Sequence, residues 1–98
     1  FLDNPHFVEE LRPKTGLDPE VSNFVLSQTD YQAFLGKLKD LLFFLLPRYC
    51  QEGKTSLTIS IGCTGGRHRS VAIAEDIGPY LLGTGSVVQV NHRDIDKD

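Results

Sequence analysis

The sequence predicts an α/β fold, in which a small sheet with parallel strands is flanked by helices. Two short runs, residues 56–61 and 87–91, combine β-branched residues with alternating apolar and polar side chains, which is typical of strands. A helical pattern over residues 70–82 lies between them. This order favours a right-handed crossover and therefore parallel strands. The length of 98 residues suits a single domain spanning residues 1–98.

The chain before these elements is predicted to be an irregular arm followed by a short helix. Turn residues, Pro13 and Gly16 among them, are scattered through residues 3–17. Asp18 before Pro19 is typical of a helix N-cap followed by proline at the first helical position, and this pattern ends near Leu26. Residues 1–2 are interpreted as a further strand cut short.

A long helix is predicted from about residue 30 to about residue 50, because leucine and aromatic residues recur there every three or four positions. Pro47 predicts that this helix bends or ends. Phe43 and Phe44 widen the apolar stripe, which leaves two interpretations. The helix is buried on more than one side, or its outer side is a subunit interface.

The second half of the chain carries one more helix and a loop. Gly78 and Pro79 interrupt the pattern of residues 70–82. An interior proline that removes a backbone hydrogen bond costs about 3 kcal/mol, so a kink or an early end is expected there. Residues 83–85 are predicted to form a loop before the second strand.

The composition excludes several classes of protein. The longest apolar run, residues 41–46, is far shorter than the roughly 20 residues that span a bilayer, and the first residues lack the basic start of a signal peptide. Two cysteines make no disulfide framework, so a reduced cytoplasmic protein is expected. The net charge of −3 favours a compact anionic ligand over a long nucleic-acid footprint.

The most informative feature is a glycine-rich basic loop between the predicted strand and the predicted helix. Backbone N–H groups at a helix N-terminus lack intrahelical partners, glycines let the backbone approach a ligand, and arginines bind oxyanions through two bonds at once. The sequence therefore predicts a phosphate-binding site. Its residues are Cys63, Thr64, Gly65, Gly66, Arg67, His68, Arg69 and Ser70.

The residue order of this loop bears on two kinds of chemistry, nucleotide binding and the hydrolysis of phosphate esters. Neither common nucleotide-binding loop, Gly-x-x-x-x-Gly-Lys-Ser/Thr or Gly-x-Gly-x-x-Gly, occurs. Cys63, five intervening residues, Arg69 and Ser70 resemble the signature of cysteine-dependent protein tyrosine phosphatases, in which a thiolate attacks phosphorus. Gly62 stands where those enzymes usually carry histidine, and no aspartate is obviously placed as the general acid. A phosphatase-like enzyme is kept as the alternative function.

Segments along the whole chain resemble the C-terminal domain of the RapZ/YvcJ family, the bacterial RNase adapter proteins. The Gly-Cys-Thr-Gly-Gly-Arg-His-Arg-Ser-Val block is highly specific. The matching segments, in chain order, are residues 4–7, 11–13, 15–18, 44–47, 57–71 and 92–93.

The resemblance implies a regulatory binding domain, with no enzyme activity of its own and no cofactor. It implies a fold like a subdomain of phosphofructokinase, a missing N-terminal P-loop domain, glucosamine-6-phosphate as ligand, a small regulatory RNA and an endoribonuclease as partners, and homo-oligomers. It places His6 at the ligand, although a histidine after Asn-Pro is commonly a surface residue. Arg12, His92 and Arg93 are assigned to ligand or RNA contacts, with solvated side chains as the alternative.

One departure from the family weakens RNA binding. RNA-binding members tend to end in a basic tail, whereas residues 94–98 read Asp-Ile-Asp-Lys-Asp. Phosphate contacts supply most of the non-specific affinity for nucleic acid. The acidic end and the net charge of −3 therefore favour the small phosphorylated ligand over RNA.

Overall fold

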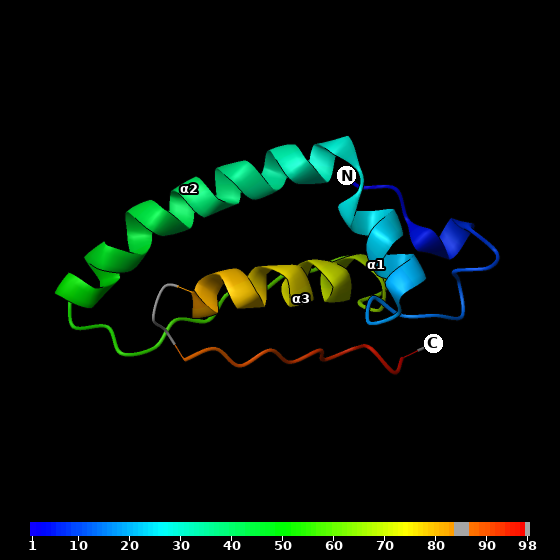
Figure 1. Ribbon diagram of the computed structural model, residues 1–98. Helices are drawn as coiled ribbons and strands as arrows, with labels where there is room; N and C mark the ends of the chain where they lie inside the picture. Colours follow the sequence, from blue (N-terminus) through cyan, green and yellow to red (C-terminus); the bar gives the residue numbers. More distant parts are fainter. Residues whose placement is uncertain (84–86, 98) are drawn as a thin grey trace.

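Three α-helices and one short 3₁₀ helix make up the regular structure of the part of the chain that the structure describes. The computed structural model describes residues 1–83 and 87–97. The elements are η1 (Pro5–Phe7), α1 (Pro19–Leu26), α2 (Thr29–Gln51) and α3 (Arg69–Leu82). Figure 1 shows α2 arching over α3, with α1 packed across one end of both. None of the described helices is long and apolar enough to cross a membrane.

The core lies where α1 meets the first half of α2 and the apolar face of α3. Tyr31, Val21 and Val25 are fully buried there, and the Tyr31 hydroxyl donates a hydrogen bond of 2.6 Å to Asp76 on α3. This bond ties α2 to α3 across the core. The buried cluster consists of Leu2, Leu11, Val21, Val25, Tyr31, Ala72, Ile73 and Ile77.

Both proline-containing helices continue past their proline, so of the two outcomes expected at Pro47 and at Gly78-Pro79, a bend or an end, the end is wrong. α2 extends to Gln51 and α3 to Leu82. A proline in a helix leaves the carbonyl four residues earlier without its donor. Those residues are Phe43 and Glu75, which are exposed, as are both prolines. Water can therefore solvate the two carbonyls, and the long helix arcs gently (Figure 1).

The predicted parallel sheet is contradicted, and so is the likeness to a phosphofructokinase subdomain. Residues 55–62 and 87–92 are extended, but no strand is formed within residues 1–83 and 87–97. Residues 1–2 form no strand either. The alternating pattern sets an extended backbone and an apolar face, whereas a strand also needs a neighbour for its hydrogen bonds. Of the loop predicted over residues 83–85, residues 84–85 lie outside the described part.

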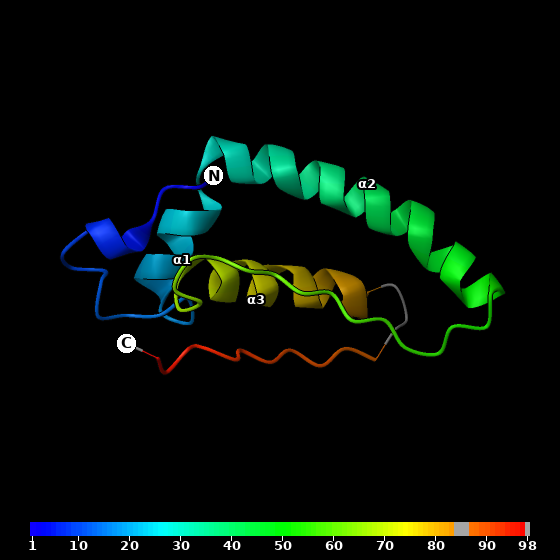
Figure 2. The ribbon, with the colours of Figure 1, turned by 180° about the vertical axis from the view of Figure 1, so that it is seen from behind.

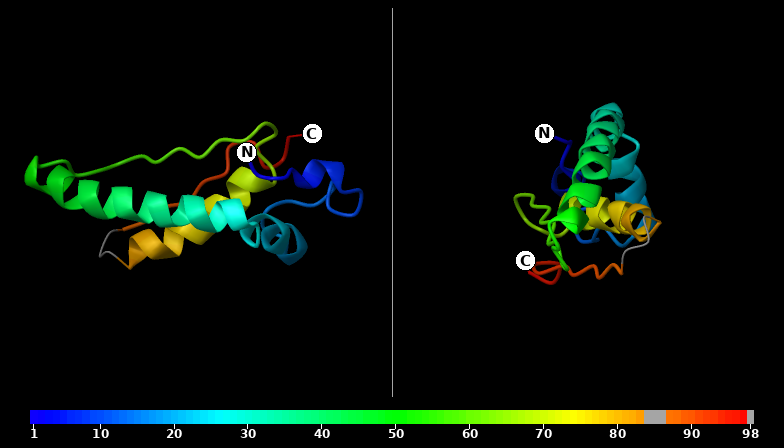
Figure 3. Two further views of the ribbon diagram at one scale, coloured as in Figure 1. Left: turned by 90° about the horizontal axis from the view of Figure 1, so that it is seen from above. Right: turned by 90° about the vertical axis from the view of Figure 1, so that its left-hand side faces the viewer.

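The two extended segments run in the same direction as each other and lie alongside α3, which runs the opposite way (Figure 1). Seen from behind in Figure 2, residues 54–62 cross the face of α3, while residues 87–97 pass beneath it. The views from above and from the side in Figure 3 place both segments on one side of α3, away from α2. Both lead toward the end of the molecule where α3 begins, which is where the glycine-rich loop lies.

Candidate functional site

The glycine-rich loop wraps around the sulfur of Cys63. Gly66 has a φ of 75°, a conformation that favours glycine, and its N–H donates to Cys63 Sγ at 3.3 Å. The Ser70 N–H, in the first turn of α3, reaches the same sulfur at 3.4 Å, and the Ser70 hydroxyl lies 3.2 Å from it. Three donor-bearing groups therefore converge on one atom at the helix N-terminus.

This convergence changes the acidity of the Cys63 thiol. Burial raises its pKa, but hydrogen bonds from the Ser70 hydroxyl, the Ser70 and Gly66 amides and the charge of Arg69 act in the opposite direction. Together they lower the pKa below the ordinary value of a cysteine thiol. The loop therefore favours a negative charge at its centre, which is the property that an oxyanion site requires.

Arg69 spans the loop from the first position of α3. One of its terminal nitrogens donates to the Thr64 hydroxyl at 3.4 Å, and the other donates to the backbone carbonyl of Leu2 at 3.0 Å. Its Nε atom is buried and makes no hydrogen bond with the described residues. The guanidinium is thus held inside the loop through two of its five N–H donors.

The N-terminal arm is fastened to the back of this loop. The buried His68 ring is 3.1 Å from the Arg12 carbonyl, and an Arg67 terminal nitrogen donates to the Pro13 carbonyl at 3.4 Å. The Gly16 N–H donates to the Arg67 carbonyl at 2.9 Å. A Cβ atom at Gly16 would lie 2.4 Å from the backbone nitrogen of Ala72, so only glycine fits this contact.

The residues predicted outside the loop lie in two parts of the chain. His6 and Arg12 belong to the N-terminal arm, and His92 and Arg93 lie near the C-terminal end. Arg12 Nε donates to the His6 carbonyl at 2.7 Å, which links both residues to the arm behind His68. The His6 side chain is exposed and packs edge-on against Phe7. His92 pairs with Glu75 at 2.9 Å, and Arg93 is bonded to Asp94. The contact of each with a ligand stays a prediction.

Two positions near the loop were missed from the sequence. Asp94 lies beside Gly66, because a Cβ atom at that glycine would be 2.8 Å from Asp94 Cβ. Hydrogen bonds from Arg93 and Lys97 lower the pKa of the Asp94 carboxyl. The Leu2 carbonyl, which anchors Arg69, is a backbone group. No sequence pattern identifies either, because both come near the loop only through folding.

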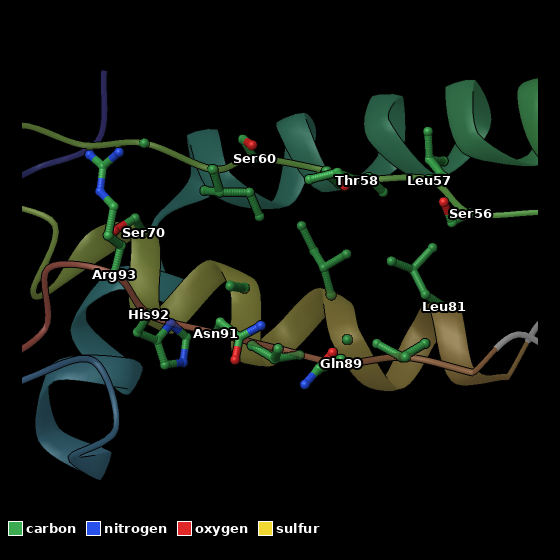
Figure 4. A pocket seen from close by; sticks show the side chains of 18 of the residues that line it. Ser56, Leu57, Thr58, Ser60, Ser70, Leu81, Gln89, Asn91, His92 and Arg93 are labelled. Atoms are coloured by element: carbon green, nitrogen blue, oxygen red, sulfur yellow. The ribbon is translucent and has the colours of Figure 1, made fainter.

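A groove adjoins the loop and ends at it. It has a volume of about 930 Å³ and is lined by the two extended segments, by α3 and by the end of α2. Figure 4 shows Arg93 extending from one segment toward the other, near Ser70 at the loop end. Cys63, Gly66 and Asp94 line this same end, so a ligand on the loop has open space beside it.

Comparison with known proteins identifies the family. The profile of the RapZ C-terminal domain matches residues 1–96. A nucleotide-binding protein of Anaeromyxobacter sp. (strain K) is 58% identical over 98 residues, which is 100% of this chain and 33% of that protein. Another, from Geobacter metallireducens, is 56% identical over 97 residues, covering 99% of the chain and 34% of that protein.

A third such protein, from Acetivibrio thermocellus, is 53% identical over 98 residues, again the whole chain and 34% of that protein. The chain therefore spans about a third of the length of these relatives. The match of one family profile to nearly every residue agrees with the resemblance carried by the loop and the Asn-Pro-His segment. The chain belongs to the RapZ C-terminal domain family.

Proposed function

We propose that this chain is a regulatory binding domain whose glycine-rich loop holds the phosphate of a phosphorylated amino sugar, with glucosamine-6-phosphate as the expected ligand. The observation that carries the proposal is the convergence of the Gly66 and Ser70 donors on one centre, where they favour negative charge, with Arg69 beside it. Helix N-termini of this kind favour phosphate groups through both their N–H groups and their dipole.

The surroundings of the loop suit the rest of such a ligand. The carboxylate of Asp94 lies beside Gly66 and is 21% exposed, so it can accept a hydrogen bond from an ammonium group. The groove offers room for a sugar ring next to the phosphate. The doubly charged phosphate of such a ligand would pair with Arg69 and the loop amides, and its single ammonium group would pair with the Asp94 carboxylate.

Calorimetry tests the proposal directly. Glucosamine-6-phosphate should release measurable heat, and Arg69→Ala should weaken binding by roughly tenfold or more, because a charge-assisted hydrogen bond contributes about 1.5–3 kcal/mol. Arg48→Ala is the matched control, since Arg48 lies on the exposed side of α2 and bonds only within that helix. Absence of heat with any sugar phosphate would refute the proposal.

The proposed function has a second part, which is that the domain also binds RNA and acts as an adapter. Arg93 is 90% exposed at the mouth of the groove, and Arg12 is exposed on the arm. A gel-shift titration with structured RNA should show affinity that falls steeply with salt and that drops in Arg12→Ala/Arg93→Ala. Affinity that is unchanged across salt concentrations would exclude this part. Binding of an endoribonuclease and self-association are proposed with it, on the strength of the family resemblance.

A phosphatase-like activity is the second candidate, and the short Ser70–Cys63 contact favours it. The Cys63 thiolate would attack phosphorus to form an S–P bond while the substrate alcohol leaves with a proton, and water would then release phosphate and restore the thiol. Asp94, the acid nearest the loop, has a lowered pKa and suits proton donation poorly. Hydrolysis of an aryl phosphate that disappears in Cys63→Ser would establish this activity, and hydrolysis that persists would exclude the thiolate mechanism.

A further inference from the structure

The groove beside α3 has the form of a channel between two extended backbones. Residues 55–62 form one edge and residues 87–92 the other, and both run toward the glycine-rich loop (Figures 1 and 4). All of residues 55–60 are exposed, as are Val87, Gln89, Val90 and Asn91. Two parallel edges therefore face one another across open space.

The backbone groups of both edges are available for hydrogen bonding. Within residues 1–83 and 87–97, no hydrogen bond involves a backbone group of residues 55–61 or 87–91. An extended segment directs the N–H and C=O groups of alternate residues to opposite sides, so each edge presents a row of donors and acceptors to the groove. Exposed edges of this kind bind a further extended peptide.

The floor of the groove is apolar, and the apolar side chains that each extended segment contributes recur at every second residue. Val88 and Val90 lean on Gly78 of α3, where a Cβ atom would lie 3.0 Å from Val90 Cγ2. On the other edge, Ile61 packs against the core, while Leu57 and Ile59 remain exposed. Figure 4 shows Leu81 directed into the space between the edges. A peptide with apolar side chains at every second position would cover this floor.

We infer that the groove binds an extended peptide segment of about five to seven residues, which pairs with both backbone edges and places alternate apolar side chains on α3. The segment comes from the part of the longer family polypeptide that lies outside this chain. This inference does not depend on the proposed phosphate ligand, because it uses the edges and the floor rather than the loop.

Two observations and one general principle favour an occupant from the same polypeptide. The chain covers about a third of its relatives, so each relative has a long stretch of sequence to supply the segment. Leucine, isoleucine and valine side chains line the groove in water, which favours permanent cover over occasional contact. A tethered segment reaches an effective concentration in the millimolar range, so modest contacts suffice to keep it bound.

A peptide panel tests this inference. Overlapping synthetic peptides would cover the part of the Anaeromyxobacter sp. (strain K) relative outside the matched stretch, and fluorescence anisotropy would measure their binding to this chain. At least one peptide with alternating apolar residues should bind. N-methylation at each of two successive central positions should weaken it about tenfold, since each removes a backbone hydrogen bond to a different edge.

The controls separate this outcome from its alternatives. Ile59→Asp should abolish binding, whereas Leu41→Asp, at a more exposed leucine on α2, should leave it unchanged. Thermal melting would verify that both variants fold. The inference is overturned if no peptide binds, if N-methylation matters at only every second position, or if the chain alone dimerises through residues 55–61 as judged by sedimentation and hydrogen exchange.

Discussion

Cys63 receives more hydrogen bonds than any other side chain in the loop, which makes its ionisation a test of the loop geometry. Its pKa is lowered in the folded chain, so ionised Cys63 stabilises the fold above the pKa of the unfolded thiol, and this contribution is lost as pH falls through the folded pKa. Iodoacetamide labelling of a Cys50→Ser variant should therefore accelerate at lower pH than labelling of the unfolded chain. Ser70→Ala should move this midpoint upward, and an unchanged midpoint would show that the Ser70 hydroxyl does not donate to the thiolate.

Gly16 allows the arm to lie against the first turn of α3. Gly16→Ala would force a Cβ atom to within 2.5 Å of the His68 carbonyl oxygen, and backbone atoms move little in response. Overpacking of this kind destabilises a protein by about 1–3 kcal/mol, so urea denaturation should show a loss in that range. Gly36→Ala is the control, because a Cβ atom there meets open space. Equal stability of the two variants would contradict the close contact.

For single residues, the sequence predicts which side chains could bind a ligand better than it predicts which distant residues lie close together. The loop residues were predicted because glycine, arginine, histidine and serine follow one another in a single segment. Asp94 and the Leu2 carbonyl were not, since they approach the loop only after the chain ends fold back. The assignment of His6 to the ligand rests on the family resemblance and stays a prediction.

The helices are the elements that the sequence predicts well. Spacings of three and four located α1, α2 and α3 to within a residue or two, because an apolar stripe specifies a helix without reference to distant partners. The prediction of strands was wrong because a strand needs hydrogen bonds to a second backbone. The alternation within residues 56–61 does not show where that second backbone lies. The sequence alone does not decide between a bend and an end at the two prolines, because the fold sets whether water can reach the carbonyls that lose their donors.

The two sides of α2 differ in burial, and this difference is measurable. Leu42 is 5% exposed and Leu41 is 52% exposed, although they are neighbours in one helix. Leu42→Ala should lower the free energy of unfolding by about 2–5 kcal/mol, whereas Leu41→Ala should change it by less than about 0.5 kcal/mol. Denaturation midpoints of the two variants check this directly. Similar losses for both would show that the outer side of α2 is covered, as a subunit interface would require.

The whole molecule is held together by few contacts across the core, and the Tyr31–Asp76 hydrogen bond is a central one. Burial, this hydrogen bond and the Asp76 charge all raise the pKa of Tyr31. Its contribution to stability is therefore complete below the unfolded pKa of about 10 and is lost as pH rises through the folded pKa.

Tyr31→Phe should cost about 1–3 kcal/mol at neutral pH, because it leaves the Asp76 carboxylate without its donor. The variant should also lose less stability than the parent chain on going to strongly alkaline pH. Denaturation at neutral and alkaline pH would measure both effects. Val25→Ala is a control, since Val25 is equally buried but does not ionise. A Tyr31→Phe chain as stable as the parent would contradict the bond.

If the proposed ligand occupies the glycine-rich loop, the arm behind the loop should couple that occupancy to proteolytic susceptibility. Lys14 lies in this arm, between the Pro13 carbonyl that Arg67 holds and the Gly16 amide bonded to Arg67. A protease can cleave this stretch only after it unfolds locally. Local unfolding breaks the backbone hydrogen bonds that orient Arg67 and His68. A phosphorylated sugar that steadies the loop will therefore slow tryptic scission after Lys14, although it never touches the scissile bond.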